Sequence, residues 1–156
     1  MTHKQYMKLA FDEAFKGIRG HKGGPFGAVI VSSGKIIGKG CNMVTSTNDP
    51  TAHAEVTAIR NACKNLKRFH LEDAVLYTSC EPCPMCLSAI YWAQIKTVYY
   101  CSSKFDTIGA GFIDKFIYDE LKRPPAKRKL SFKKVELETG RKLFSEWTNM
   151  EDKINY

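Results

Sequence analysis

The sequence predicts an α/β domain of three layers, in which helices cover both faces of a mixed five-stranded sheet. Two observations predict this class. An apolar hairpin lies near the N-terminus, and helical and strand-like segments alternate after it, with no internal repeat or low-complexity tract between them. Such alternation is typical of a sheet packed between helices. The length of 156 residues, 44% of them apolar, suits one domain with its own core.

The first half of the chain predicts a helix, a hairpin and a second helix. Thr2 can cap the first helix, which several glycines end. The pair Ser33-Gly34 lies between two apolar stretches and predicts a tight hairpin turn. Asp49 is a favoured N-cap and Pro50 suits the first helical position, so the next helix is expected to begin there. The expected elements are a helix at 2–19, strands at 26–32 and 35–41, and a helix at 50–66.

The second half continues the alternation. Pro82 and Pro84 suit the opening of a largely apolar helix. The run Thr97–Cys101 is rich in β-branched and aromatic residues, which favour a strand. The stretch 122–128, around two prolines, is the one segment expected to be flexible. The expected elements are strands at 74–78, 97–101 and 132–137, and helices at 82–92, 113–121 and 141–152.

The excess positive charge is local. Of the net charge of +8, all but one unit lies in residues 122–134, which hold seven basic residues and no acidic one. This segment predicts either contact with nucleic acid or a solvated basic loop, and the loop is the more ordinary interpretation. No apolar run approaches the roughly 18 residues that a membrane helix needs, and the N-terminus lacks a signal-peptide pattern. We therefore expect a cytoplasmic protein with no membrane partner.

Six cysteines occur, at positions 41, 63, 80, 83, 86 and 101. In a cytoplasmic protein of this size, clustered cysteines indicate metal binding or catalysis rather than disulfides. Cys41, Cys63 and Cys101 stand alone in apolar surroundings and are expected to be small buried side chains. The remaining three form a cluster.

Two segments carry the candidate chemistry, and each begins an expected helix: His53-Ala54-Glu55 and Cys83-Pro84-Met85-Cys86. Cys83 and Cys86 are three residues apart, so their sulfur atoms share a helical face and can bind one metal ion. The free N–H groups and partial positive charge of a helix N-terminus favour thiolates. His53 and Glu55 diverge on a helix flank but can share a site beyond the helix end. We therefore expect the metal between two helix N-termini, with Glu55 close to it but not a ligand.

Two thiolates and one imidazole make three protein ligands, which is the pattern of a catalytic zinc site with an open fourth position. We expect one Zn²⁺ per chain, with a water or hydroxide as the fourth ligand. Zinc lowers the pKa of such a water to about 7, and Glu55 can take its proton and pass it to leaving ammonia. His-Ala-Glu followed by Pro-Cys-x-x-Cys is the signature of zinc nucleobase deaminases.

Other interpretations of the cysteine pair are weaker. A redox pair would need a thioredoxin-like context, and a zinc ribbon would need a second Cys-x-x-Cys, and the sequence has neither. One alternative stays open: Cys80, as a further thiolate and the fourth protein ligand, would close the site and make it structural.

With these motifs the chain resembles the cytidine-deaminase-like superfamily and, within it, the small bacterial guanine deaminases. The likeness rests on the stretches GGPFGAVIV from Gly23, NDPTAHAEV from Asn48 and YTSCEPCPMC from Tyr77, on the length and on the C-terminal tyrosine. It covers essentially the whole chain. The resemblance implies a cytidine-deaminase-like fold and the hydrolysis of guanine to xanthine and ammonia in purine salvage.

The resemblance also implies that Asn42 forms a hydrogen bond with the base and that Phe26 and Ala54 contact it. From the residues alone, Phe26 suits a core position at the start of a strand equally well. Asn42, which precedes a polar loop, equally suits a turn.

In the family, the C-terminal part, here from about residue 110, is exchanged between the subunits of a homodimer and covers the partner's site. The resemblance implies that Asp114 is a second acid touching the purine and that Tyr156 completes a lid. The family has another acid where this chain has Ile113. A carboxylate can accept hydrogen bonds from the N1–H and amine of guanine, so a second acid has a physical basis. Without the resemblance, Asp114 is a helix N-terminal charge and Tyr156 a frayed end.

Four functions remain open. The first is a guanine deaminase acting on the free base, a small-molecule purine. The second is a guanosine deaminase, whose pocket must leave room for ribose. The third is a tRNA adenosine deaminase, which would use the basic segment for phosphate contacts, although nucleic acid is the less expected partner. The fourth, from another class, is a zinc-stabilised binding module without turnover.

Overall fold

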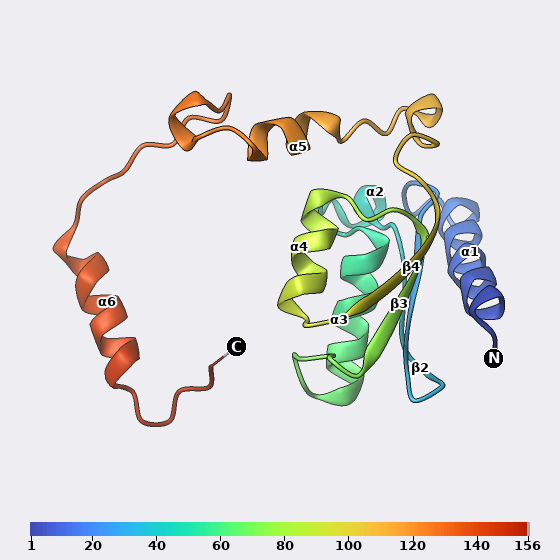
Figure 1. Ribbon diagram of the computed structural model, residues 1–156, viewed down its shortest axis with the longest axis horizontal. Coiled ribbons are helices and arrows are strands. Elements are labelled where there is room, and N and C mark those ends of the chain that lie inside the picture. Colours follow the sequence, from blue (N-terminus) through green and yellow to red (C-terminus); the bar gives the residue numbers. More distant parts are fainter. Residues whose placement is uncertain (156) are drawn as a thin grey trace. The chain divides into compact units, whose positions relative to one another are not determined.

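The computed structural model describes residues 1–155 and divides into two compact units, Met1–Asp114 and a second unit that begins at Lys115 (Figure 1). The first unit contains α1 (His3–Arg19), β1 (Gly27–Ser32), β2 (Lys35–Cys41), α2 (Val44–Thr47), α3 (Ala54–Leu66), β3 (Ala74–Cys80), α4 (Pro84–Trp92), β4 (Thr97–Ser102) and the 3₁₀ turn η1 (Ile108–Ala110). The second contains α5 (Lys115–Leu121), the 3₁₀ turn η2 (Pro125–Lys127) and α6 (Glu138–Asn149). No helix of the described part is both long and apolar enough to cross a membrane.

The first unit is built on a mixed sheet with the strand order β2-β1-β3-β4. Strand β1 runs antiparallel to both β2 and β3, and the hairpin between β1 and β2 agrees with the sequence prediction. Strands β3 and β4 run parallel. A parallel pair needs a crossover connection, and α4 provides it.

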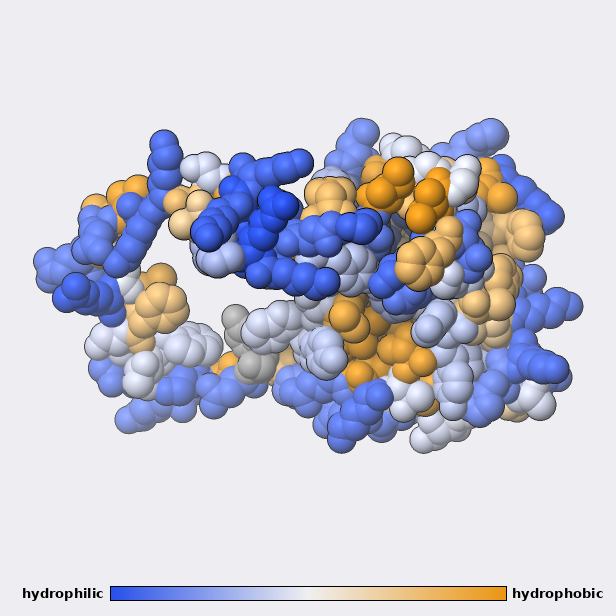
Figure 2. Space-filling model, turned by 45° about the horizontal axis from the view of Figure 1, so that its top comes forward, coloured by the Kyte–Doolittle hydropathy of each residue, from blue (hydrophilic) through white to orange (hydrophobic). Residues whose placement is uncertain are grey.

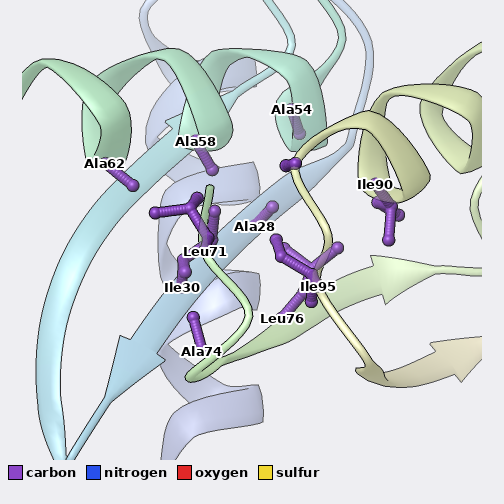
Figure 3. Close-up of a cluster of buried hydrophobic side chains, with 11 residues drawn as sticks. Ala28, Ile30, Ala54, Ala58, Ala62, Leu71, Ala74, Leu76, Ile90 and Ile95 are labelled. Carbon is purple, nitrogen blue, oxygen red and sulfur yellow. The ribbon is translucent and has the colours of Figure 1, made fainter. Parts of the chain in front are cut away.

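Helices cover both faces of this sheet, as the sequence predicts. Along β1, Ala28 and Ile30 pack with α3 and Leu76, while Val29 and Val31 pack with α1 on the other face. This alternation follows from the two-residue period of a strand, and it explains why β1 is apolar throughout. Figure 1 shows α1 on one side of the sheet and α3 with α4 on the other, and Figure 3 shows Ala28 and Ile30 among the side chains of the α3 layer.

Two glycines of β2 let α3 approach the sheet closely. A Cβ atom at Gly40 would lie 2.4 Å from the carbonyl oxygen of Ala54 and 2.6 Å from the amide nitrogen of Ala58. A Cβ atom at Gly38 would lie 2.4 Å from the carbonyl oxygen of Ala58. Any side chain there would meet helix backbone, so the small residues set the position of α3. His53 and Glu55, at the start of this helix, are placed by the same contact.

The expected fifth strand is wrong: the sheet has four strands. Residues 132–137 form no ladder with any described strand, and Phe132, Val135 and Leu137 are exposed. Their alternating apolar pattern predicts extended backbone, but a strand also needs a partner for its N–H and C=O groups. The pattern carries no information about that partner.

The helix expected from residue 50 begins later, at Ala54. Oδ1 of Asp49 accepts hydrogen bonds from the backbone N–H of Thr51 at 2.8 Å and from its hydroxyl at 2.7 Å. Asp49 therefore stabilises a local turn instead of capping a helix. Three other helices also begin at residues other than those expected: α4 at Pro84 rather than 82, α5 at Lys115 rather than 113, and α6 at Glu138 rather than 141.

Candidate metal and catalytic site

The two candidate segments meet at the starts of two helices. His53 is the N-cap of α3 and Cys83 the N-cap of α4, both with extended backbone, and Cys86 lies in the first turn of α4. Neither N-cap side chain forms a capping hydrogen bond with its helix. The His53 imidazole and the Cys83 sulfur therefore point toward each other and do not cap the helices that they precede.

The distances within this group fit a tetrahedral zinc ion. Nδ1 of His53 lies 3.6 Å from Sγ of Cys83 and 3.5 Å from Sγ of Cys86. All three ligand atoms lie within 4.8 Å of one another. Zinc bonds of about 2.0 Å to nitrogen and about 2.3 Å to sulfur place tetrahedral N and S ligands about 3.5 Å apart. His53, Cys83 and Cys86 therefore suit zinc in both chemistry and spacing.

Cys80 is not part of this group. Among the described histidines, cysteines and acids, the group that could hold a metal consists of His53, Cys83 and Cys86. The Cys80 thiol instead donates a hydrogen bond to the carbonyl oxygen of Ser103 at 3.7 Å. Burial and the nearby Glu55 raise the pKa of this thiol to about 11. With Cys80 left as a thiol, the described residues offer three ligands for the metal.

The cluster favours a thiolate at Cys83. Contacts with Cys86 and with His53 lower the pKa of Cys83 to about 4, against the effect of burial. The contact with Cys83, together with burial, raises the pKa of Cys86. The bond with Cys83 also raises the pKa of His53, despite partial burial. A stabilised thiolate beside an imidazole is the charge arrangement that a divalent metal requires.

Glu55 lies beside the three ligands in the first turn of α3, and its side chain is buried. Its Oε2 accepts a hydrogen bond from Sγ of Cys86 at 3.4 Å, and its Oε1 accepts one from Oγ1 of Thr78 at 3.2 Å. Burial raises the pKa of this carboxyl above its usual range. A buried carboxyl with a raised pKa, next to a metal site, is suited to accept and return a proton.

The loop before β1 meets the end of β2 at Asn42. Asn42 is buried, and its Oδ1 accepts hydrogen bonds from the backbone N–H groups of Gly24 and Val44, each at 3.2 Å. The Asn42 side chain therefore links the two loops through hydrogen bonds, and both bonds use its Oδ1 atom. The Phe26 ring packs edge-on against Phe112, with ring centroids 4.8 Å apart, and also contacts the core under α3.

The remaining candidates are placed as follows. Ala54 is fully buried in the core cluster. Asp114 is half-buried at the end of the first unit, directly before α5, and is not among the metal-ligand group. Tyr156 lies outside the described residues.

Two contacts were not anticipated from the sequence. One is the Thr78 hydroxyl, which donates to Glu55. The other is Glu81, whose carboxylate accepts from the backbone N–H of Lys104 at 3.3 Å and pairs with the Lys104 ammonium at 3.7 Å. The available signal for Thr78 was a polar side chain near the end of a largely apolar strand, where Ser79 is polar as well. A pattern of this kind does not predict which residue accepts the hydrogen bond.

A helix-covered mixed sheet with such a cluster defines a class of zinc-dependent deaminases. Residues 1–102 match the family described as "Cytidine and deoxycytidylate deaminase zinc-binding region", and this range includes every residue of the cluster. The chain belongs to this family and is a zinc-dependent aminohydrolase.

Among individual relatives, guanine deaminase from Bacillus subtilis is 51% identical over 156 residues, which is 100% of both chains. The X-ray structure of that enzyme superposes with a TM-score of 0.96, covering 100% of this chain and 99% of the other. A tRNA-specific adenosine deaminase from Aquifex aeolicus is 35% identical over 148 residues, 94% of each chain.

Proposed function

We propose that the protein hydrolyses guanine to xanthine and ammonia, as an enzyme of purine salvage. The observation that carries this proposal is the similarity to a guanine deaminase along the full length of both chains, including the C-terminal unit. The family domain by itself ends at residue 102 and does not distinguish the substrates. The distinction therefore rests on the whole chain rather than on the metal site.

In this reaction, the chain supplies proton transfer and positioning. Zinc, when held by His53, Cys83 and Cys86, supplies the Lewis acid that makes water nucleophilic near neutral pH. Glu55 accepts a proton from the attacking water through Oε2 and delivers it to the leaving amine. Burial of the carboxyl, which raises its pKa, favours the protonated form that this second step needs.

The purine is held by groups around the metal site. Oδ1 of Asn42 is occupied by two backbone donors, so its NH₂ group is the one we assign to an acceptor on the base. We assign Phe26 and Ala54 to the lining of the same pocket. Asp114 and Tyr156 belong to the segment proposed to be exchanged, so Asp114 accepts hydrogen bonds from the guanine bound by the other subunit, and Tyr156 closes that subunit's pocket.

We further propose that the protein is a homodimer with an exchanged C-terminal segment. Apolar side chains of the second unit are open to solvent. They include Val135, Leu137, Leu143 and Phe144. Figure 2 shows that orange, hydrophobic atoms lie among the blue ones on one face of the molecule. Segments with so much exposed apolar surface are typical of an interface. We also expect the protein in the cytoplasm, because all six cysteines are free and a thiolate metal site suits a reducing compartment.

A substrate panel scored by ammonia release tests the proposed function. We expect the zinc-loaded protein to deaminate guanine, with little dependence on salt because the base is uncharged. Glu55→Gln should keep about one zinc per chain and lose turnover, since it keeps the shape of the side chain and removes the proton acceptor. Glu72→Gln, which changes an exposed glutamate, is the matched control and should behave as wild type. Zinc binding without turnover of any base would identify a binding module instead.

A tRNA adenosine deaminase is the second candidate, and guanosine is a related alternative substrate. The A. aeolicus relative and the basic segment 122–134 are the observations that favour tRNA. The panel therefore includes guanosine and a tRNA anticodon stem-loop. Turnover of the stem-loop that falls steeply with salt, while guanine stays inert, would overturn the guanine proposal.

A further inference from the structure

Thr78 contacts the buried end of the proposed proton-transfer residue. It lies in the central strand β3, with 1% of its surface exposed, and its backbone is held between Ala28 of β1 and Tyr100 of β4. Its Oγ1 lies 3.2 Å from Oε1 of Glu55 and donates a hydrogen bond to it. A β-branched side chain on a paired strand has few rotamers, so the hydroxyl is fixed in place.

The other carboxylate oxygen has a different kind of partner. Oε2 of Glu55 accepts from the Cys86 thiol at 3.4 Å. Zinc ligation requires Cys86 as a thiolate, and a thiolate has no proton to donate. The hydroxyl of Thr78 is not a metal ligand and keeps its proton. The contact at Oε1 therefore persists when the site is loaded, whereas the contact at Oε2 loses its donor.

We propose that Thr78 is a positioning residue for Glu55: its hydroxyl holds Oε1, so that Oε2 remains directed to the metal ligands and the reacting amine. The inference rests on the proposed function insofar as Glu55 moves the proton. Proton transfer requires the acceptor atom within hydrogen-bond reach of the reacting group. A carboxylate that can rotate about its last bond spends less time in that orientation.

The expected effect is on the chemical step. Thr78 makes no contact with His53, Cys83 or Cys86 through its hydroxyl, so its loss should leave zinc content unchanged. Hydrogen bonds to charged groups have net strengths that correspond to about a ten- to hundred-fold change in rate. We expect kcat to fall by this factor and KM for the base to change little.

Two variants at this position separate the hydroxyl from the packing of the strand. Thr78→Val is close in shape and removes only the donor, while Thr78→Ser keeps the donor and removes a methyl group. Ser79→Ala is the matched control, because Ser79 is equally buried on the next position of β3 and its Oγ accepts from the backbone N–H of Gly27. Loss of the Ser79 hydroxyl should lower stability but should not produce the fall in kcat that is expected for Thr78→Val.

The experiment measures kcat, KM, zinc per chain and the unfolding midpoint, on whichever base of the panel the wild type deaminates. Low kcat for Thr78→Val with near-normal zinc, and recovery in Thr78→Ser, would support the inference. Wild-type kcat in Thr78→Val, a serine variant as slow as the valine variant, or loss of zinc in Thr78→Val would each overturn it.

A crystal structure of the zinc-loaded wild type and of Thr78→Val gives a second readout that needs no turnover. We expect Oε1 of Glu55 on the Thr78 hydroxyl in the wild type and a rotated carboxylate in the variant. An unrotated carboxylate would overturn the inference. If the wild type deaminates no base, the proposed function fails, and this comparison alone decides the role of Thr78.

Discussion

Cys80 lies only three residues before Cys83, and yet its sulfur takes a different role. Cys80 ends β3, whereas Cys83 and Cys86 belong to the start of α4, so the turn between them directs the sulfur atoms to different partners. The Cys80 thiol donates to Ser103 and stays protonated at neutral pH, because its pKa is raised to about 11. The geometry therefore does not favour a closed site in which Cys80 is the fourth protein ligand.

Replacement of Cys80 by serine tests this assignment. We expect Cys80→Ser to keep about one zinc per chain and turnover within a few-fold of wild type, because three ligands remain. Cys83→Ser is the comparison variant and should lose zinc. Metal analysis after dialysis checks both. Loss of zinc from Cys80→Ser would mean that Cys80 is a ligand.

The raised pKa of Cys80 also predicts a dependence of stability on pH. The thiol holds its proton more tightly in the folded chain than in the unfolded chain, whose ordinary value is 9.0. Its contribution to stability is therefore complete below about pH 9 and is lost as the pH rises through about 11. The free energy of unfolding, measured with urea under reducing conditions at pH 8 and at pH 10.5, should fall less between these two pH values for Cys80→Ala than for wild type. Equal losses would contradict the raised value.

At the scale of elements, the close approach of α3 to β2 positions half of the metal site. The contact relies on Gly38 and Gly40, because helix backbone occupies the space where a side chain would lie. Both the histidine ligand and the proton-transfer residue follow the helix start. The metal site therefore depends on two glycines, which have no reactive side chain.

Gly40→Ala should destabilise the zinc-loaded protein by about 1–3 kcal/mol, because the new methyl group would meet backbone atoms of α3. We also expect weaker zinc binding, since His53 moves with the helix. Gly109→Ala is the control, because a Cβ atom there meets nothing within 4 Å. Its free energy of unfolding should change by less than about 0.5 kcal/mol. Similar unfolding curves for the two variants would contradict the packing argument.

The loop between β4 and α5 connects the metal site to the proposed purine pocket. At its start Lys104 bonds with Glu81, and at its end Phe112 packs against Gly24 and Phe26. The residues that follow include Asp114. The loop thus links the cysteine-bearing segment, the Phe26 loop and the proposed second acid within the first unit.

Phe112→Ala should raise KM for guanine several-fold, since an aromatic pair of this geometry contributes about 0.5–1.5 kcal/mol. Zinc content should not change, because the ring contacts no ligand residue. Phe105→Ala, which removes a 71% exposed ring from the same loop, is the control and should leave KM unaltered. An unchanged KM in Phe112→Ala would separate the loop from substrate binding.

At the scale of the whole molecule, the described part of the second unit, residues 115–155, buries none of its apolar residues. Every residue of α6 is exposed, including Leu143, Phe144 and Trp147. We expect sedimentation at micromolar concentration to show a dimer, and Phe144→Asp to shift it to a monomer with low activity. Glu146→Gln, on the same helix, should remain dimeric. A monomeric wild type would refute the proposed exchange.

Removal of residues 153–156 should lower turnover of guanine by about ten-fold or more, because an open site admits water and holds the base poorly. The unfolding midpoint should change little, since the described part of the segment is mostly exposed. Glu151→Gln, at full length, is the control. Full activity of the shortened chain would rule out a lid role for Tyr156.

Much of the fold was predictable because it depends on local signals. The hairpin turn, the period of β1 and the proline at the start of α4 are each contained in a few neighbouring residues. Two errors have different causes: Asp49 forms a local turn with Thr51, two residues away, instead of a cap, whereas the pairing of residues 132–137 depends on distant segments and no described strand pairs with them. The candidate ligands were predictable from their spacing, whereas the Thr78 contact was not, because 23 residues separate it from Glu55.

The sequence by itself determined the ligand types, the acid beside them and the layering of helices on a sheet, since motif spacing and hydrophobic period act over a few residues. Only the tertiary structure decided that Nδ1 of His53 meets Sγ of Cys83 at 3.6 Å across 30 residues of chain, that Cys80 stays apart and that the sheet ends at four strands. These outcomes depend on which remote segments pack together, and packing is settled by the close contacts of whole elements rather than by any one stretch of residues.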